Sequence, residues 1–333
     1  LVGAGAPAFD GLIGDPTGPH PRVVIVYDPN ATRAYEPQLD RVRSMVQRGL
    51  TNMTATATVT GAWLSLLSPQ DIVGIKVYTR PGPDGGTRLA VVEAVVETLL
   101  EAGLPPKHIV VWDKQRSDLR QAGYFVLEQR YGIRVEGSAN AGFDSGVFYS
   151  PDIPLLGPLI WSDLEFGKTT EGAGRKSHVS KLVSQELTKI VNLSPLLNHY
   201  DIGVSGNLYS LSFGSVDNTQ RFELNPNYLA QTIPEIYALP SVGDKVVLNI
   251  VDALICQYQG QQVGRLHYAT TLNELRFSKD PVALDLLSVE TLTQQRRLTQ
   301  TAATVVNKEI FSNAALLQLG VSELTKIMAE RLQ

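Results

Sequence analysis

Residues 188–218, TKIVNLSPLLNHYDIGVSGNLYSLSFGSVDN, form the stretch that decides the fold. Its first seven residues, TKIVNLS, have the pattern of a buried β-strand, and Pro195 is expected to end that strand. Polar and glycine-rich sequence follows, and the stretch carries Asn192, Asn198, His199, Asp201, Asn207 and Asp217. Polar side chains just past a strand mark the crevice where open α/β sheets bind their ligands. The stretch therefore predicts a strand with a binding site at its end.

Short runs rich in valine and isoleucine alternate with helical patterns on both sides of this stretch. We expect buried strands at 22–27, 71–78, 108–113, 131–137, 188–194, 245–255 and 271–278. Helical spacing and end signals predict helices at 36–50, 87–102 and 281–298, and two more near 300–311 and 321–332. The alternation predicts an α/β fold whose central sheet is mostly parallel and has helices on both faces.

A chain of 333 residues is too long to fold around one small core, so we expect one large domain or two lobes around a crevice. Residues 1–20 are rich in Gly, Pro and Ala, and we interpret them as a flexible leader left after signal processing or as the start of a truncated chain. The remaining chain is divided into an N-terminal α/β lobe, an irregular excursion rich in Gly and Pro, and a C-terminal α/β lobe, at residues 21–140, 141–180 and 181–333.

Composition excludes several classes of protein. The net charge of -4 and the lack of a basic stripe argue against nucleic-acid binding. No run of about 18 apolar residues exists, so we expect no transmembrane segment. Cys256 is the only cysteine, which rules out an intrachain disulfide, a four-cysteine zinc site and an iron–sulfur cluster. His178, expected on an exposed loop, and His199 fit no compact metal signature, so we expect no metal and no cofactor.

Lys76 stands inside the apolar strand GIKVY, where an unpaired ammonium would be costly. The structural interpretation is an ion-paired or snorkelling lysine. The functional one is an anion-binding group at the end of a strand, with Asp113 on the next strand as its partner. Thr87 and Arg88 open a helix after the glycine-rich loop RPGPDGG, where free N–H groups bind anions. The loop lacks the Lys-Ser/Thr ending of a P-loop, so the phosphate signal is weak.

His199 follows the end of a strand beside Asn198, which makes it the candidate acid or base. Lys76 and Asp113 complete the candidate catalytic group, with Asp113 or Asp252 orienting the histidine. The candidate substrate-binding residues are Thr87, Arg88, Asn192, Asn198 and Asp252. No Gly-x-Ser-x-Gly elbow precedes a helix in the right context, so a Ser-His-Asp triad is not supported.

Five blocks together resemble the family called domain of unknown function 362. The blocks are DIVGIKVY at 71–78, TRLAVVEAVVETLLEAGLPPKHIVVWDKQRSDLRQAGY at 87–124, TKIVNLSPLLNH at 188–199, GVSGNLYSLSFGSVDN at 203–218 and FSKDPVALD at 277–285. Many members similar to this chain carry export signals, so the resemblance implies a periplasmic or extracellular protein. The family has no generally assigned reaction. Some members carry iron–sulfur clusters, for which one cysteine is too few.

The sequence departs from the family pattern within the expected site. The residues that match the pattern are Lys76, Thr87, Arg88, Asp113, His199, Asp252 and Asp280. An asparagine of the pattern is replaced by Tyr78, a lysine by Leu197, and a Lys-Asn pair by Tyr209 and Ser210. These replacements remove donors that would bind an anion.

Two functions follow from these observations. The first is an exported, degenerate family member that acts as a binding or structural subunit of a larger assembly, or as a homo-oligomer, because tyrosine is a good interface residue. The alternative is an enzyme or binder for a small anionic substrate in the inter-lobe crevice. Lys76 and Arg88 would then hold the anion, and His199 would act as acid or base. An open polar pocket favours the second function, and a crevice filled by the substituted residues favours the first.

Overall fold

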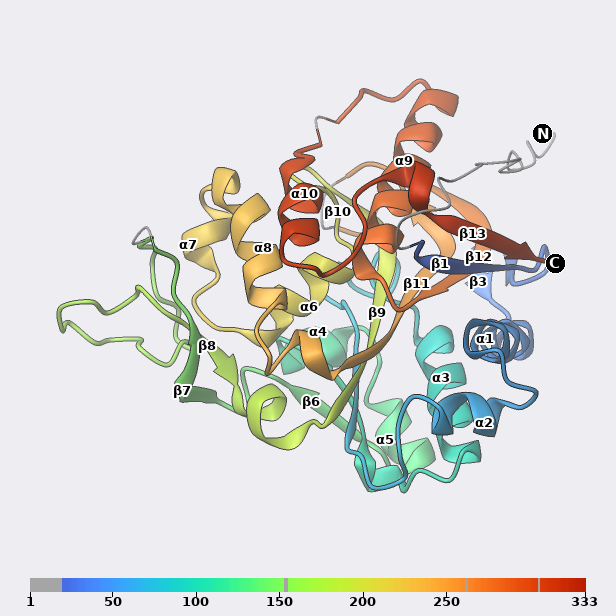
Figure 1. The fold of residues 1–333 in the computed structure, drawn as a ribbon, viewed down its shortest axis with the longest axis horizontal. Coiled ribbons are helices and arrows are strands. Elements are labelled where there is room, and N and C mark those ends of the chain that lie inside the picture. Colours follow the sequence, from blue (N-terminus) through green and yellow to red (C-terminus); the bar gives the residue numbers. More distant parts are fainter. Residues whose placement is uncertain (1–19, 153–154, 261–262, 305) are drawn as a thin grey trace.

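The computed structural model describes residues 20–333 apart from 153–154, 261–262 and 305. Among these residues a central sheet of nine strands has the order β13-β1-β12-β11-β9-β4-β5-β6, with β10 paired to β9. Figure 1 shows helices packed on either side of this sheet. Residues 1–19 of the expected leader lie outside the described residues.

The strands of the central sheet are β1 (Arg22–Tyr27), β4 (Val73–Lys76), β5 (Ile109–Asp113), β6 (Arg134–Gly137), β9 (Lys189–His199), β10 (Gly203–Val204), β11 (Val246–Gln257), β12 (Ala269–Ser278) and β13 (Met328–Leu332). Neighbouring strands run parallel except where β12 meets β1 and β11 and where β10 meets β9. Two ribbons stand apart, formed by β2 (Thr32–Arg33) with β3 (Glu36–Pro37) and by β7 (Phe143–Tyr149) with β8 (Ser177–Ser180). The prediction of a mostly parallel sheet is confirmed.

Ten α-helices cover the two faces of the sheet in the described part of the chain. The first face is covered by α1 (Leu39–Thr54), α2 (Val59–Leu64), α3 (Leu89–Glu101), α4 (Arg116–Gln121) and α5 (Val126–Tyr131). The second face is covered by α6 (Asn207–Ser215), α7 (Gln220–Glu223), α8 (Leu229–Tyr237), α9 (Pro281–Leu298) and α10 (Glu309–Leu316). Helices on both faces bury both sides of the parallel strands, which explains their near-continuous apolar sequences.

Short helical turns complete the secondary structure. These are η1 (Pro106–His108), a π-helical turn η2 (Leu182–Glu186), η3 (Pro226–Tyr228), η4 (Gly243–Lys245), η5 (Leu266–Tyr268) and η6 (Leu324–Lys326). The expected excursion at 141–180 begins and ends in the β7–β8 ribbon, which projects from one end of the molecule in Figure 1. Of the helices described, none is long and apolar enough to cross a membrane.

The expected end of a strand at Pro195 is wrong, because β9 continues to His199. On one side β4 pairs with β9 only as far as Asn192, so the missing N–H of Pro195 breaks no hydrogen bond there. On the other side the register with β11 shifts between Asp252 and Gln257, just after the Pro195 pair. An irregularity at an edge or bulge is where a sheet tolerates proline. The extension carries His199 beyond the end of β4.

The helix predicted near 321–332 is also wrong. Residues Met328–Leu332 form β13, which pairs in parallel with β1 from Arg22 to Val26. The sequence MAERL favours a helix locally, but backbone pairing with β1 at the open edge of the sheet overrides that weak preference. The helix predicted near 300–311 lies later in the chain, as α10.

The two-lobe division is not confirmed. One sheet contains strands from both expected lobes, and β1 lies between β12 and β13. The sheet is therefore continuous across residues 21–140 and 181–333. The division into two lobes, with the crevice between them, stays a prediction.

Candidate functional site

A cleft lies at the carboxyl ends of the parallel strands β4 and β5. Its walls come from the residues at and after the ends of these strands, from Ile160, from residues 209–214 of α6 and from residues 219–223, and its volume is about 250 Å³. We call it the strand-end cleft. Tyr78 and Tyr209 line it but leave it open, whereas Leu197 is fully buried away from it. Its position agrees with the rule that open α/β sheets bind ligands outside the carboxyl ends of their strands.

A second cavity, of about 500 Å³, adjoins the strand-end cleft and contains His199. We call it the His199 cavity. The two share Arg80, Tyr209, Gln220 and Glu223 in their walls. The ring of Tyr209 lies 4.8 Å from the ring of His199 and so forms part of the partition. The predicted catalytic residues are therefore divided between two neighbouring spaces.

Lys76 lies beneath the strand-end cleft and is fully buried. Its ammonium donates to Asp113 Oδ1 at 2.8 Å, to Ser210 Oγ at 3.1 Å and to the carbonyl of Val77. Burial lowers the pKa of Lys76, and the negative charge of Asp113 opposes that shift. Three acceptors around one nitrogen use every donor of an ammonium, so we assign Lys76 as charged.

Asp113 has no free hydrogen-bonding capacity for chemistry. Its Oδ1 accepts from Lys76 and from the amide of Lys114 at 2.8 Å. Its Oδ2 accepts from the amide and the hydroxyl of Thr79, both at 2.7 Å. Two donors on each oxygen fill the acceptor capacity of this carboxylate. The Lys76–Asp113 pair is thus a buried clamp that joins the ends of β4 and β5.

Lys114 is the cation that the sequence analysis missed. It directly follows Asp113 at the end of β5 and lines the strand-end cleft. Its ammonium donates to Thr219 Oγ1 at 2.8 Å, and among the described residues no carboxylate lies within 4 Å of it. Burial lowers its pKa, while the charge of Glu223 at longer range opposes this. The rule that strand ends carry the site could have found Lys114.

Arg80 and Glu223 form an ion pair at 3.1 Å where the two cavities meet. Arg80 lies after the end of β4, and Glu223 is the last residue of α7. The Tyr209 hydroxyl donates to the same carboxylate oxygen of Glu223 at 3.2 Å. Arg80 is exposed, so solvent screens this pair and its stabilising effect is small.

His199 is a neutral donor in the second cavity. Its Nδ1 accepts from the amide of Asp201 at 3.2 Å, which assigns the proton to Nε2. Burial and the positive charge of Arg80 lower the pKa of His199 to about 4. At neutral pH the ring therefore presents an uncharged N–H and has no free acceptor on Nδ1. This arrangement suits hydrogen bonding better than proton transfer.

Thr87, Arg88 and Asp252 lie together, away from the strand-end cleft. The Arg88 amide and guanidinium donate to Asp252 Oδ2 at 2.9 and 3.3 Å. The Thr87 hydroxyl donates to the carbonyl of Leu193 at 3.1 Å and accepts from the amide of Tyr78. The predicted helix cap at Thr87 is displaced by one residue, because Arg88 takes the cap position of α3. These contacts tie α3 to β9 and β11.

Asn192 and Asn198 are fully buried in β9. Asn192 Nδ2 donates to Asn249 Oδ1 and to the carbonyl of Asn207, both at 3.0 Å. Neither polar atom of the Asn198 side chain has a hydrogen-bond partner among the described residues. Neither asparagine lines the two cavities. Their place in the core favours a structural role over contact with a ligand.

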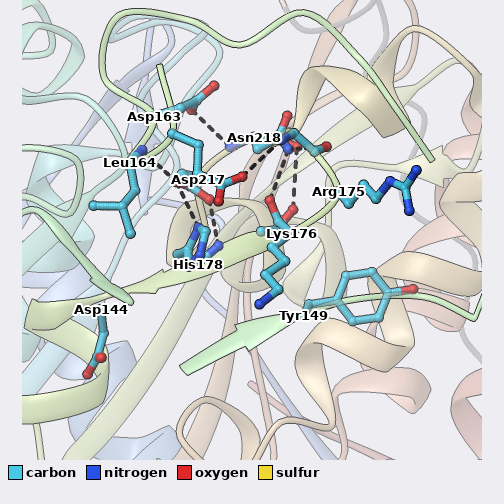
Figure 2. Close-up of polar contacts among 12 residues, drawn as sticks. Asp144, Tyr149, Asp163, Leu164, Arg175, Lys176, His178, Asp217 and Asn218 are labelled. Atoms are coloured by element: carbon cyan, nitrogen blue, oxygen red, sulfur yellow. Dashed lines mark hydrogen bonds and ion pairs between the residues drawn. The ribbon is translucent and has the colours of Figure 1, made fainter. Parts of the chain in front are cut away.

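The wall of the strand-end cleft formed by Ile160 is held by the network in Figure 2. Asp163 accepts from the amides of Ile160 and Asn218 at 2.8 and 2.9 Å. Asp217 accepts from the amides of His178 and Leu164 at 2.5 and 2.8 Å, and its Oδ2 lies 3.5 Å from His178 Nδ1. His178 is buried, so its expected place on an exposed loop is wrong. The network fastens the excursion beside α7.

An iron–sulfur cluster does not fit the residues present. The single cysteine, Cys256, is fully buried in β11, and burial raises its pKa to about 12. A cluster needs several thiolates, which one protonated thiol does not supply. Within the described ranges no three His, Cys, Asp or Glu side chains gather in a way that could hold a metal ion.

Fold and cleft together define an α/β protein with a polar cleft at the ends of its parallel strands. The sequence model of the domain of unknown function DUF362 matches residues 73–290, and the chain belongs to this family. The matched segment runs from β4 into α9 and includes every wall of the strand-end cleft. No curated protein matches the chain.

Proposed function

We propose that this chain is a binding protein for a small anionic molecule, which occupies the strand-end cleft. The observation that carries the proposal is the ammonium of Lys114, which faces the cleft and has no carboxylate within 4 Å among the described residues. The other cations of the site, Lys76 and Arg80, already have the carboxylates of Asp113 and Glu223 as partners. A partly buried ammonium without a counter-ion attracts an anion strongly, because the local dielectric is low.

Ser210 supplies a second donor to the anion. Its hydroxyl oxygen accepts from Lys76, so its proton is free to point toward the cleft that Ser210 lines. Hydrogen bonds to charged groups are about twice as strong as those between neutral groups. The ammonium of Lys76 therefore acts on the ligand through Ser210 without touching it.

Binding is favoured over catalysis by the positions of the predicted catalytic residues. Lys76 has all three donors occupied, and Asp113 has two donors on each oxygen. His199 lies in the adjoining cavity with its pKa lowered to about 4. None of the three is placed to exchange a proton with an anion at Lys114, which a general acid or base requires.

Calorimetric titration with a panel of small carboxylates and phosphates tests the proposal. We expect at least one compound to bind the natural chain, and Lys114→Met to weaken that binding by about tenfold or more, or about 1.4 kcal/mol. The matched control is Lys107→Met, an exposed lysine before the amino end of β5, which should change nothing. Absence of binding across the panel, or equal binding by Lys114→Met, would contradict the proposal.

A second candidate function is a structural or binding subunit of an exported assembly. The observation that favours it is Trp161 in the excursion, whose exposure is 86%. Leu156 and Phe166 are exposed in the same segment, and tryptophan is enriched at interface hot spots. Self-association in sedimentation velocity, lost in Trp161→Ser, would support a homo-oligomer. Sedimentation as a monomer at all concentrations would oppose it. Fractionation of the native cells tests the exported location.

A further inference from the structure

The strand-end cleft contains an unpaired carboxylate as well as an unpaired ammonium. Asp118, in the first turn of α4, lines the cleft and is partly buried. Its side chain accepts from Ser117 Oγ at 3.2 Å, and no cation lies within 4 Å of it among the described residues. Burial and the negative charge of Asp113 raise the pKa of Asp118. An approaching cation would stabilise the ionised carboxylate and so oppose both effects.

The other charges at the cleft cancel in pairs. Lys76 neutralises Asp113 at 2.8 Å, and Arg80 neutralises Glu223 at 3.1 Å. Among the described residues that line the cleft, one cation and one anion remain, Lys114 and Asp118, and they are not within ion-pair distance of each other. Lys114 lies between β5 and α4, Asp118 lies in the first turn of α4, and both line the same space of about 250 Å³. A purely anionic ligand would satisfy Lys114 but be repelled by Asp118.

We propose that the ligand of the strand-end cleft is a small zwitterion of the amino-acid class, with its carboxylate on Lys114 and its ammonium on Asp118. This inference rests on the proposed function and adds the ammonium to it. A zwitterion turns the repulsion by Asp118 into attraction and leaves both charges paired, which a cleft of low dielectric favours. The aromatic rings of Tyr78, Tyr209 and Phe213 in the wall add surfaces that attract a cation.

Matched ligands separate the ammonium from the carboxylate. Each amino acid is titrated by calorimetry beside the acid that lacks its amino group and the amine that lacks its carboxylate. The sets are glycine with acetate and methylamine, β-alanine with propionate and ethylamine, and γ-aminobutyrate with butyrate and propylamine. We expect one amino acid to bind the natural chain about tenfold or more tighter than its parent acid. The best chain length then reports the separation of the two charged side chains.

The variant Asp118→Asn tests whether Asp118 binds the ammonium group of the ligand. We expect it to lose the advantage of the amino acid while it keeps or improves the affinity for the parent acid, which also shows that the variant folds. The matched control is Asp40→Asn on α1, whose side chain is 97% exposed and remote from the cleft. If Asp118→Asn does not fold, the comparison of matched ligands on the natural chain still decides.

The outcomes distinguish this inference from the proposed function. Parent acids that bind in a Lys114-dependent way, with no gain from the amino group, would overturn the zwitterion and leave the anion site standing. An amino-acid advantage that survives in Asp118→Asn would also overturn it, because the ammonium would then lie elsewhere. Absence of binding by every acid and amino acid would overturn both.

Discussion

The ammonium of Lys76 lies 3.1 Å from the hydroxyl oxygen of Ser210, immediately beneath the strand-end cleft. Lys76 comes from the last position of β4 and Ser210 from α6, which are far apart in the chain. Because the lysine donates, the serine is left with a proton to donate toward the cleft. The contact connects a charge in the core to the surface of the strand-end cleft.

Ser210→Ala should weaken the binding of anions without unfolding the protein. A hydrogen bond to a charged ligand is worth about 1.5–3 kcal/mol, so the affinity should fall roughly tenfold to a hundredfold. Calorimetry with the best ligand of the panel measures the loss. Ser215→Ala is the control on the same helix, because the Ser215 hydroxyl donates to the carbonyl of Leu211 and does not line the cleft. Equal effects of the two substitutions would show that Ser210 is not a ligand contact.

Lys76→Met should destabilise the fold strongly, because it leaves the carboxylate of Asp113 buried without its cation. Breaking a buried pair by removing one partner costs about 3–5 kcal/mol of unfolding free energy. Chemical denaturation measures it. The double variant Lys76→Met, Asp113→Leu should recover part of the loss, since no charge then remains buried. A loss below about 1 kcal/mol in the single variant would show that water compensates the carboxylate.

Gly214→Ala should destabilise the protein although alanine favours a helix over glycine by about 1 kcal/mol. A Cβ at position 214 of α6 would lie 2.1 Å from Cε of Lys76, which is too close without movement of the lysine. We expect a net loss of about 1–2 kcal/mol from overpacking, measured by urea denaturation. At Gly146 an added Cβ has no neighbour closer than 3.5 Å, so Gly146→Ala is the matched control. A gain in stability in Gly214→Ala would contradict the prediction.

Asp285 should make stability fall as the pH rises toward 7. Its carboxyl group accepts from the amides of Asn207 and Leu208 at the start of α6, and burial raises its pKa to about 7. A raised pKa means that the folded chain binds more protons than the unfolded chain between about pH 4 and 7. The contribution of Asp285 to the unfolding free energy is therefore fully present below about pH 4 and is lost as the pH rises through about 7.

The variant Asp285→Asn tests that sign. It removes the titrating group, so its unfolding free energy should depend less on pH than that of the natural chain in this window. Across this window the unfolding free energy of the natural chain should fall by at most about 4 kcal/mol more than that of the variant, because each unit of pKa shift corresponds to about 1.36 kcal/mol. Denaturation at pH 4.5, 6 and 7.5 measures it. Parallel curves for the two proteins would show that Asp285 is ionised throughout.

The α/β fold could be predicted from the sequence because parallel strands buried on both faces leave an unmistakable local pattern. The strand expected at 22–27 is β1, and the apolar core of 108–113 is β5. The helix expected at 281–298 agrees with α9, where Asp280 caps the first turn through the amide of Ala283. Propensity, capping and hydrophobic periodicity are short-range effects, and they agree with the final fold at these places.

Only the tertiary structure decided where the chain departs from its local preferences. MAERL becomes β13 because the edge of β1 offers backbone partners more than three hundred residues away. Pro195 stays within β9 because β4 has already ended. Lys76 is buried because Asp113, Ser210 and Val77 complete its hydrogen bonds. Such partners depend on packing between distant segments, which local sequence does not encode.

The sequence predicted a site at the ends of strands, with Lys76, Asp113 and His199 as its catalytic members, and that assignment stays a prediction. Packing then placed the first two at the strand-end cleft and His199 in the adjoining cavity, and it brought in Lys114 and Ser210. A strand end determines which residues emerge at an edge of the sheet. Which of them keep an unpaired charge depends on the partners that other segments supply, and that is fixed only when the chain is folded.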